Sequence, residues 1–180
     1  YDPAGNRLEE STLSGVEGQS PIVKTYSHNK NNEMLGYSHS GEGRNPVSFE
    51  YDSNGNMVKK VDGANTFEYL YNLENRLSEV KLNTHTLATY GYDPFGRRLW
   101  KSLTLSGVEG GLKTYFFYTD EGLTAEINAS GEVVKTYGYT PNSIWTTDPL
   151  FTRDGGQYYF YHNDHLATPQ MITSSNGSIV

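Results

Sequence analysis

The sequence predicts an all-β fold, in which an array of antiparallel β-hairpins forms a coiling sheet. Three observations predict it: a tyrosine-anchored repeat, an abundance of turn-forming residues and a shortage of aliphatic ones. Of the 180 residues, 15 are Tyr and 19 are Gly, and only 35% are hydrophobic. Tyr favours strands because its ring is apolar while its hydroxyl can stay in water, and Gly favours turns. The composition therefore indicates short strands joined by tight turns.

A motif that opens with Tyr-Asp provides the anchors of this array. Residues 1–8 read YDPAGNRL, residues 51–58 read YDSNGNMV and residues 92–99 read YDPFGRRL. Weaker copies occur between and after these three. The anchor tyrosines, spaced 20 to 26 residues apart, are Tyr1, Tyr26, Tyr51, Tyr71, Tyr92, Tyr118, Tyr139 and Tyr161. A repeat of this length is typical of chains built from stacked supersecondary units.

Each unit predicts roughly one hairpin. A second tyrosine often precedes the anchor by two residues, as in Tyr69 and Tyr71, so both rings lie on one face of a strand. The Asp or Asn after the anchor can accept backbone N–H groups, and the Gly or Asn three residues later can take a positive φ. These predicted turn residues are Asp2, Gly5, Asp52, Gly55, Asp93 and Gly96. An alternating run then predicts the return strand, so eight units predict about sixteen strands.

A second repeat lies between the anchors. The segment TLSGVEG occurs at residues 12–18 and again, word for word, at residues 104–110. Both copies follow a Tyr-Asp motif and lead into Lys-Thr-Tyr. They therefore predict extensions of two hairpins.

Composition and motifs also limit the function. The net charge of −7, from 14 Lys and Arg against 21 Asp and Glu, disfavours a nucleic-acid partner, which needs a basic surface. The chain has no Cys, which excludes disulfides, Cys-type zinc sites and thiol nucleophiles. No run of apolar residues is long enough for a membrane span, and no phosphate-binding loop, nucleophile elbow or HExxH motif occurs. We therefore predict no enzymatic activity and no cofactor.

One cluster carries ligand-type side chains. His162, Asp164 and His165 form a His-x-Asp-His pattern that is compatible with a metal site. On a strand, however, His162 and His165 would point to opposite faces, which favours a turn capped by Asp164. The arginines that follow the turns could bind an anionic ligand, but we expect them to stack on the tyrosine rings of the adjacent hairpin. These arginines are Arg7, Arg76, Arg97 and Arg98.

These motifs resemble the YD-repeat, or Rhs, family. Residues 154–170, which read DGGQYYFYHNDHLATPQ, resemble the start of the family's Rhs-associated core, with Ala167 where the family usually has Gly. The resemblance implies a repeat array over residues 1–153 and the start of a core-like segment over residues 154–180, continuous with the array. In that family the repeats spiral into a hollow β-shell, which encloses a C-terminal toxin in bacterial systems and serves cell adhesion in teneurins.

The resemblance implies a non-catalytic scaffold at the cell surface or outside the cell. Its partners would be the rest of a longer chain and an enclosed C-terminal cargo. The family's self-cleavage motif is Asp-Pro-x-Gly-Leu, and Asp148-Pro149-Leu150 lacks its Gly-Leu and precedes the core-like segment, so we reject it as a cleavage site.

Two alternatives remain. One is an adhesion or carbohydrate-binding module, because tyrosine faces can stack on the sugar rings of glycans. The other is a fibre-like protein that self-associates through open sheet edges near Tyr1 or near Ile179 and Val180, because unpaired edges pair with other chains.

Overall fold

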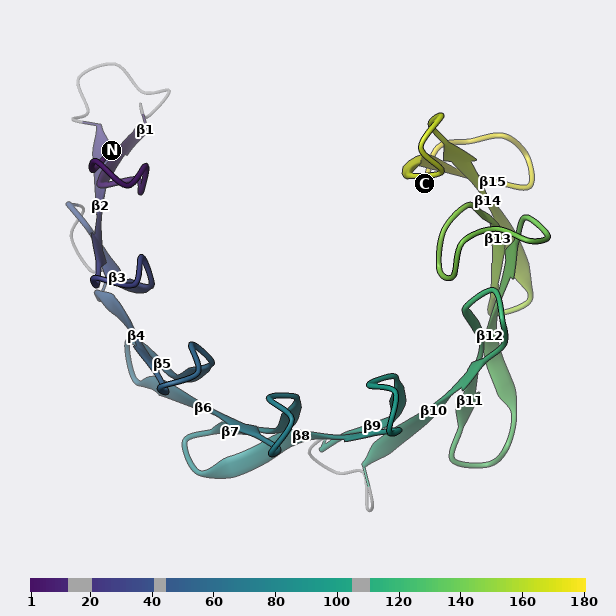
Figure 1. The fold of residues 1–180 in the computed structure, drawn as a ribbon, viewed down its shortest axis with the longest axis horizontal. Helices are drawn as coiled ribbons and strands as arrows, with labels where there is room; N and C mark the ends of the chain where they lie inside the picture. Colours follow the sequence, from purple (N-terminus) through teal and green to yellow (C-terminus); the bar gives the residue numbers. More distant parts are fainter. Residues whose placement is uncertain (13–20, 41–44, 105–110) are drawn as a thin grey trace. The chain divides into compact units, whose positions relative to one another are not determined.

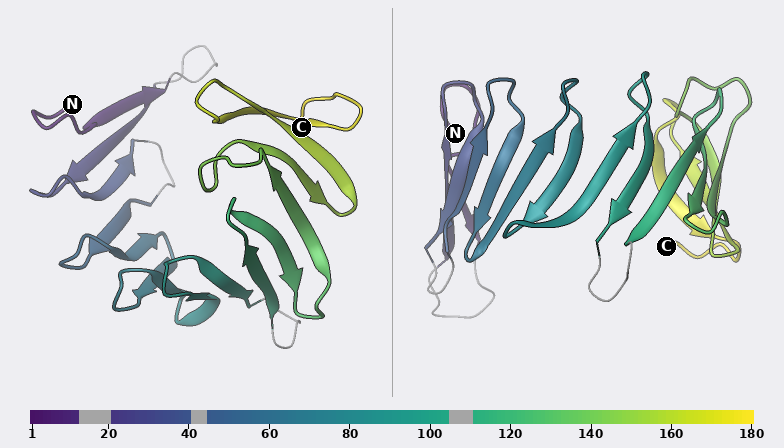
Figure 2. Two further views of the ribbon diagram at one scale, coloured as in Figure 1. Left: turned by 45° about the vertical axis from the view of Figure 1, so that its right-hand side comes forward. Right: turned by 90° about the horizontal axis from the view of Figure 1, so that it is seen from below.

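The computed structural model describes residues 1–12, 21–40, 45–104 and 111–180. The predicted all-β antiparallel fold is confirmed: these residues form fifteen strands and no helix (Figure 1). The chain divides into two compact units, residues 1–89 and residues 90–180. Within each unit every strand pairs antiparallel with the next one in sequence, so hairpin follows hairpin (Figure 2).

The first unit contains seven complete strands and most of an eighth. They are β1 (Glu9–Thr12), β2 (Ile22–His28), β3 (Met34–His39), β4 (Val47–Tyr51), β5 (Met57–Asp62), β6 (Asn65–Tyr71), β7 (Leu77–Leu82) and β8 (His85–Tyr92), the last of which ends in the second unit. The two-residue turn between β7 and β8 has positive φ at both Asn83 and Thr84, the arrangement that matches the twist of a hairpin.

The second unit continues the same pattern. Its strands are β9 (Arg98–Leu103), β10 (Leu112–Tyr118), β11 (Leu123–Asn128), β12 (Val133–Tyr139), β13 (Pro149–Asp154), β14 (Gln157–Asn163) and β15 (Pro169–Ser174). The predicted hairpin extensions fall largely outside the described residues. The strands that flank them are paired, with Thr12 opposite Ile22 and Leu103 opposite Leu112.

The register sorts side chains of the first unit onto two unlike faces. On one face, Tyr26 lies opposite Tyr37, and Lys60 lies between Phe49 and Phe67. We call this the tyrosine face. The opposite, polar face carries hydroxyl and charged groups, including a cross-strand row of alternating sign that consists of Glu50, Lys59, Glu68 and Lys81. This separation is the period-two pattern that the repeat predicts.

The described residues contain very little hydrophobic core. Only Val47 and Ala88 are buried apolar residues, and no large side chain among the described residues is fully buried. Sheets usually bury one face against a second layer of structure. Neither unit has such a layer among its described residues, so its stability has to come from contacts between successive strands.

A β-bulge recurs at the repeat turns. The register shifts at Tyr51, Tyr71, Tyr118 and Tyr139, each of which is an anchor tyrosine. A bulge bends its strand and increases the local twist, and it re-aims the side chain at that position. The anchor ring is therefore aimed differently from the other rings of its strand.

Candidate functional site: the repeat turns and their tyrosines

The repeat turns share one hydrogen-bond geometry. The Oδ1 atom of Asp52 accepts the backbone N–H groups of Asn54 and Asn56, both at 2.9 Å. The same pair of bonds, from the residues two and four positions ahead and at 2.8 to 3.0 Å, forms at Asp2, Asn29, Asn72, Asp93, Asn128 and Asp164. The prediction that the acidic residue accepts N–H groups at the turn is thus confirmed.

The predicted positive φ is also confirmed. It is 85° at Gly5, 83° at Gly55 and 88° at Gly96. Asn32 and Asn75, at 63° and 58°, take the same place in two other turns, because Asn tolerates the left-handed region. Each of these turns is closed by a backbone bond, such as the N–H of Gly55 donating to the carbonyl of Asp52 at 3.1 Å.

In five of these seven turns a matching rule links the side chains of the first and fifth residues; the exceptions are the turns that open at Asn72 and at Asp164. Where the first residue is Asp, its second oxygen accepts from a donor: Asn56 Nδ2 donates to Asp52 Oδ2 at 2.9 Å, and Arg97 Nε donates to Asp93 Oδ2 at 2.5 Å. In two of the turns that open with Asn, the Nδ2 of that residue donates to a carboxylate, as Asn128 does to Glu132 at 2.8 Å. Asn29 and Glu33 form the second such pair. The side chains therefore have complementary hydrogen-bonding groups.

These bonds lower the pKa of the turn carboxyls. The side-chain hydrogen bonds from Asn6 and Asn56 hold the pKa of Asp2 and Asp52 below its usual value. Burial would raise the pKa of Asp93, but the hydrogen bonds and charge of Arg97 outweigh it and the net shift is downward. The turns are thus built around the ionised form of the carboxyl.

Four of the anchor tyrosines bond their hairpins to the strand that precedes them. The hydroxyl of Tyr51 donates to the carbonyl of Met34, and that of Tyr71 to the carbonyl of Met57, both at 3.0 Å. In the second unit Tyr118 and Tyr139 do the same to Arg98 and Leu123, at 2.9 and 3.1 Å. Desolvation by burial raises the pKa of all four hydroxyls. Phe could not replace Tyr in this role.

Two glycines, on the side of the strand opposite its tyrosines, make room for large rings of the next strand. A Cβ on Gly91 would lie 2.2 Å from the indole of Trp100, and a Cβ on Gly138 would lie 2.3 Å from the ring of Phe151. Each glycine stands between two tyrosines, in the sequence Tyr-Gly-Tyr. The glycine therefore lets an aromatic ring cover the strand closely, which adds contact on the side opposite the tyrosines.

Stacking of arginine on tyrosine is confirmed at two positions. The guanidinium of Arg97 lies 5.2 Å from the ring centre of Tyr118, and that of Arg98 lies 5.0 Å from Tyr90. Arg7 and Arg76 form ion pairs with Glu10 and Glu74, both at 3.1 Å.

The His-x-Asp-His cluster has a different arrangement from a metal site. Asp164 caps the turn between β14 and β15, and its second oxygen accepts from Gln170 at 3.1 Å. His162 lies on β14 with its Nε2 3.0 Å from the hydroxyl of Thr173. Among the described residues, no three His, Asp or Glu side chains are grouped as a metal site requires. His165 therefore belongs to no such group.

In two of the repeats the turn does not begin directly after the anchor tyrosine but two residues later. After Tyr26 the turn opens at Asn29, and after Tyr161 it opens at Asp164, whereas Asp52 directly follows Tyr51. The bulges precede these turns at His28 and Asn163. The two tyrosines therefore occupy the position that Tyr69 holds in its own unit, two residues before the bulge. The sequence does not show where a bulge falls, so the late start of these two turns could not be predicted from it.

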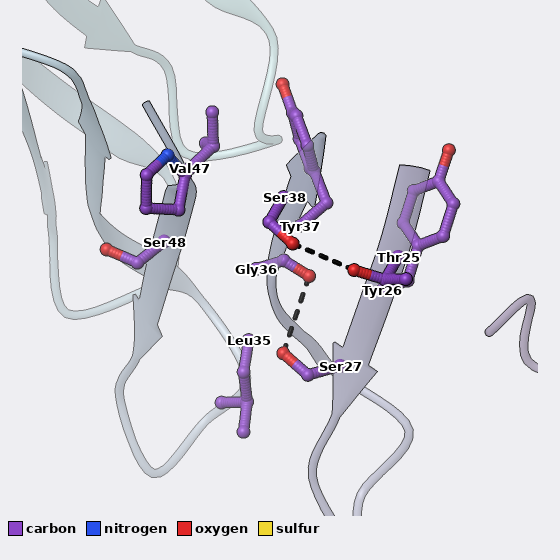
Figure 3. A pocket seen from close by; sticks show the side chains of 10 residues that line it. Thr25, Tyr26, Ser27, Leu35, Gly36, Tyr37, Ser38, Val47 and Ser48 are labelled. Atoms are coloured by element: carbon purple, nitrogen blue, oxygen red, sulfur yellow. Dashed lines mark hydrogen bonds between the residues drawn. The ribbon is translucent and has the colours of Figure 1, made fainter. Parts of the chain in front are cut away.

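A shallow hollow also lies across β2, β3 and β4, as Figure 3 shows. Its volume is about 300 Å³, and hydroxyl side chains line much of it, with Thr25 and Ser38 2.8 Å apart. β3 and β4 pair at only two positions, and a Cβ on Gly36 would come within 2.3 Å of the carbonyl oxygen of Val47. No charged side chain lines this hollow among the described residues, so it offers little to a charged ligand.

Serial hairpins, joined by capped turns and by tyrosine hydroxyls that bond to the preceding strand, define a YD-repeat sheet. The model of the family Teneurin YD-shell matches residues 47–180, and the chain belongs to this family. None of the described residues lies in a helix long and apolar enough to cross a membrane.

Two curated relatives show how small a part of them this chain matches. The tRNA3(Ser)-specific nuclease WapA of Bacillus spizizenii is 30% identical over 168 residues, which is 92% of this chain and 6% of the relative. Double-stranded DNA deaminase toxin A of Burkholderia cenocepacia is 25% identical over 206 residues, 99% of this chain and 13% of that protein. Among solved structures, the complex TcdB2-TccC3-Cdc42 aligns with a TM-score of 0.46 and 13% identity, over 89% of this chain and 8% of that one.

Proposed function

We propose that this chain is a non-catalytic wall segment of a β-shell that encloses a C-terminal toxin cargo and is exported from the cell. One observation carries the proposal: the described part of each compact unit is a single layer of serially bonded hairpins with almost no core of its own. A shell wall requires contacts between neighbouring strands and two exposed faces, and it does not require a hydrophobic core within each segment. Residues 154–180 would begin the core-like segment of the shell.

The chemistry of the turns supports a structural role. Carboxylates are the most numerous groups suited to acid–base catalysis, and those of Asp2, Asp52 and Asp93 have both oxygens engaged in hydrogen bonds within their turns. A catalytic base needs an oxygen free to take a proton from a substrate. An acceptor oxygen that recurs in seven turns, on either Asp or Asn, and is bonded in the same way each time is better explained by turn formation.

The relatives' names support the toxin part of the proposal. They are called nucleases and a deaminase toxin, and this chain matches only 6 to 13% of their lengths. The matched region and the Teneurin YD-shell model are consistent with a shell segment that lies apart from the domain responsible for each named activity.

Protease protection tests the enclosure of a cargo. The longest natural polypeptide that contains these 180 residues would be treated with a non-specific protease, and the survival of the segment downstream would be followed by mass spectrometry. We expect the downstream segment to survive in the native protein and to be digested after brief acid or urea treatment. Digestion of that segment at the same rate in both states would overturn the proposal.

Of the two sheet edges proposed for self-association, the edge at β15 is partly covered, so the edge at β1 is the better candidate. The chain turns back on β15, where Thr173 forms a bridge with Ile179 and the N–H of Val180 donates to the carbonyl of Ile172 at 3.1 Å. This covers part of the outer edge of β15 with the chain's own residues, which disfavours pairing there. Pairing through β1 remains the form of self-association to be tested by light scattering over a wide concentration range.

A further inference from the structure

The connection between β12 and β13 breaks the rule of the repeat turns. Residues 140–148 form an irregular loop in which three residues other than Gly have positive φ: Asn142 at 63°, Thr146 at 65° and Asp148 at 52°. A β-branched residue such as Thr is rare in this region, and strained backbone concentrates at functional sites. The loop is held by the N–H of Thr146, which donates to the carbonyl of Glu121 at 2.7 Å.

This loop places an indole ring on the neighbouring hairpin. Trp145 stacks on Tyr118 with ring centres 6.2 Å apart and planes inclined by 28°, and its Nε1 donates to the carbonyl of Thr119 at 3.3 Å. The indole then forms one wall of an open groove of about 430 Å³. Its other lining residues include Phe95, Arg97, Arg98, Phe116 and Tyr118.

The groove combines apolar walls with positive charge. Phe95 is 84% exposed and Trp145 is 43% exposed, both high values for rings of this size. Arg97 is paired with Asp93, so its charge is balanced. Arg98 lies 5.0 Å from Tyr90 and 6.0 Å from Phe116, and it forms no ion pair with a carboxylate in the described part of the chain. An anion in the groove would therefore meet a cation that has no counter-charge among the described residues.

We propose that this groove binds a peptide segment in which a bulky apolar side chain lies beside a carboxylate. The volume is within the range of small-ligand sites, and the aromatic walls suit an aliphatic or aromatic side chain. A guanidinium whose plane is fixed by flanking rings can receive a carboxylate through two parallel hydrogen bonds. Charge complementarity with Arg98 thus selects an acidic segment over a basic one.

The hydrogen-bonding groups of the groove favour a peptide over a sugar. The hydroxyl of Tyr118 is engaged by the carbonyl of Arg98, and the indole N–H of Trp145 by that of Thr119. A sugar would need several donors and acceptors for its hydroxyls, and these would be left unpaired at a cost. This inference stands apart from the shell proposal, because a groove on a wall segment can bind a peptide whether or not a cargo is enclosed.

Saturation-transfer NMR with the 180-residue chain tests the proposal. The probe is N-acetyl-L-leucine, which carries a carboxylate beside an aliphatic side chain, and the matched neutral probe is N-acetyl-L-leucinamide. We expect millimolar binding of the acid, as is usual for so small a ligand, and binding at least fivefold weaker for the amide. The resonance of the Trp145 indole N–H should shift on titration with the acid.

Two substitutions locate the binding. Arg98→Gln removes the charge but keeps the backbone carbonyl that accepts from Tyr118, and we expect it to weaken binding of the acid at least fivefold. Arg153→Gln is the control, because Arg153 also lies over a ring, that of Tyr158 at 6.0 Å, but outside the groove. It should leave binding unchanged, and both variants should keep the circular dichroism spectrum of the parent.

Three results would overturn the proposal. One is equal affinity for acid and amide, and another is equal loss in the Arg98 and Arg153 variants. The third is binding of methyl β-D-glucuronide at the Trp145 resonance in the absence of binding by N-acetyl-L-leucine, which would assign the groove to acidic sugars.

Discussion

The matching rule of the turns predicts the effect of exchanging a single atom in Asn128. Asn128→Asp would keep the oxygen that accepts the N–H groups of Ser130 and Glu132, at 3.0 and 2.9 Å. It would replace the Nδ2 atom, which now donates to Glu132 Oε2 at 2.8 Å, by a second carboxylate oxygen. The change leaves the size of the side chain and the turn backbone untouched, so only the match between the two side chains is lost.

The expected loss has two parts. A hydrogen bond at a surface turn contributes about 1 kcal/mol. Two carboxylates whose charges lie roughly 4 Å apart in a largely aqueous setting repel by about 1 kcal/mol. We therefore expect Asn128→Asp to lower the free energy of unfolding by about 1–2 kcal/mol at pH 7. At about pH 3, where carboxyl groups take up protons, the repulsion should vanish and a protonated carboxyl can again donate.

Urea unfolding of four proteins measures this coupling. With a urea dependence of about 2 kcal/mol per M, the midpoint should fall by roughly 0.5–1 M in Asn128→Asp. Glu132→Gln alone should change little, because Gln still offers an oxygen to Asn128. The double variant Asn128→Asp/Glu132→Gln should recover most of the loss, because it recreates the Asp52–Asn56 arrangement. A double variant as unstable as Asn128→Asp alone would refute the rule.

Three further outcomes follow from the turns and glycines. Gly96→Ala should cost roughly 1 kcal/mol or more in urea unfolding because φ is 88°, and Gly96→Asn should cost less, since Asn is accepted at this place in other turns. The pKa of Asp52 is lowered in the folded state, so its contribution to stability is full above about pH 4 and is lost as the pH falls through the lower folded value. Between pH 7 and pH 2, the urea midpoint should therefore fall less in Asp52→Asn than in the parent protein. Gly91→Ala should cost about 1–3 kcal/mol in thermal unfolding because the added Cβ crowds Trp100. Adding Trp100→Leu to that variant should relieve much of the cost.

Local features of this fold could be predicted from sequence because they depend on residues close together in the chain. The acceptor role of Asp52 and the positive φ of Gly55 involve a turn of five residues, and the motif displays all of them. The alternation of the strands likewise predicts which side chains share a face. The all-β fold follows from repeating these local choices along the chain.

Features that depend on register were not predictable in the same way. The bond from Tyr71 to the carbonyl of Met57 joins residues of neighbouring strands, and the bulge at Tyr71 sets the direction of the ring. A bulge adds one residue to one strand and leaves no mark in the composition. The same reason explains why Tyr26 and Tyr161 fall two residues before the bulge, and why the loop that carries Trp145 was not recognised as a groove wall.

Because the sheet has so little core, other contacts have to fix its register. Three sets of contacts do so: the ring contacts of the tyrosine face, the charged row of the polar face and the hydroxyl bonds of the anchor tyrosines. A slip of one residue would move the rings to the polar face, where they would lose their neighbours on the tyrosine face. A slip of two residues would keep each ring on its face but would break the row in which Glu50 lies opposite Lys59, and Lys59 opposite Glu68.

Directly opposed pairs of opposite charge contribute about 0.2–1 kcal/mol each, and like charges in the same place are unfavourable, so the row penalises the slip at several strands at once. The hydroxyl bonds of the anchor tyrosines then set the order between hairpins, because Tyr71 reaches only one carbonyl of the preceding strand. Register in this protein is therefore specified hairpin by hairpin through many weak, local contacts. For that reason we expect a single substitution to loosen its own hairpin and its two neighbours before it affects strands farther along the chain.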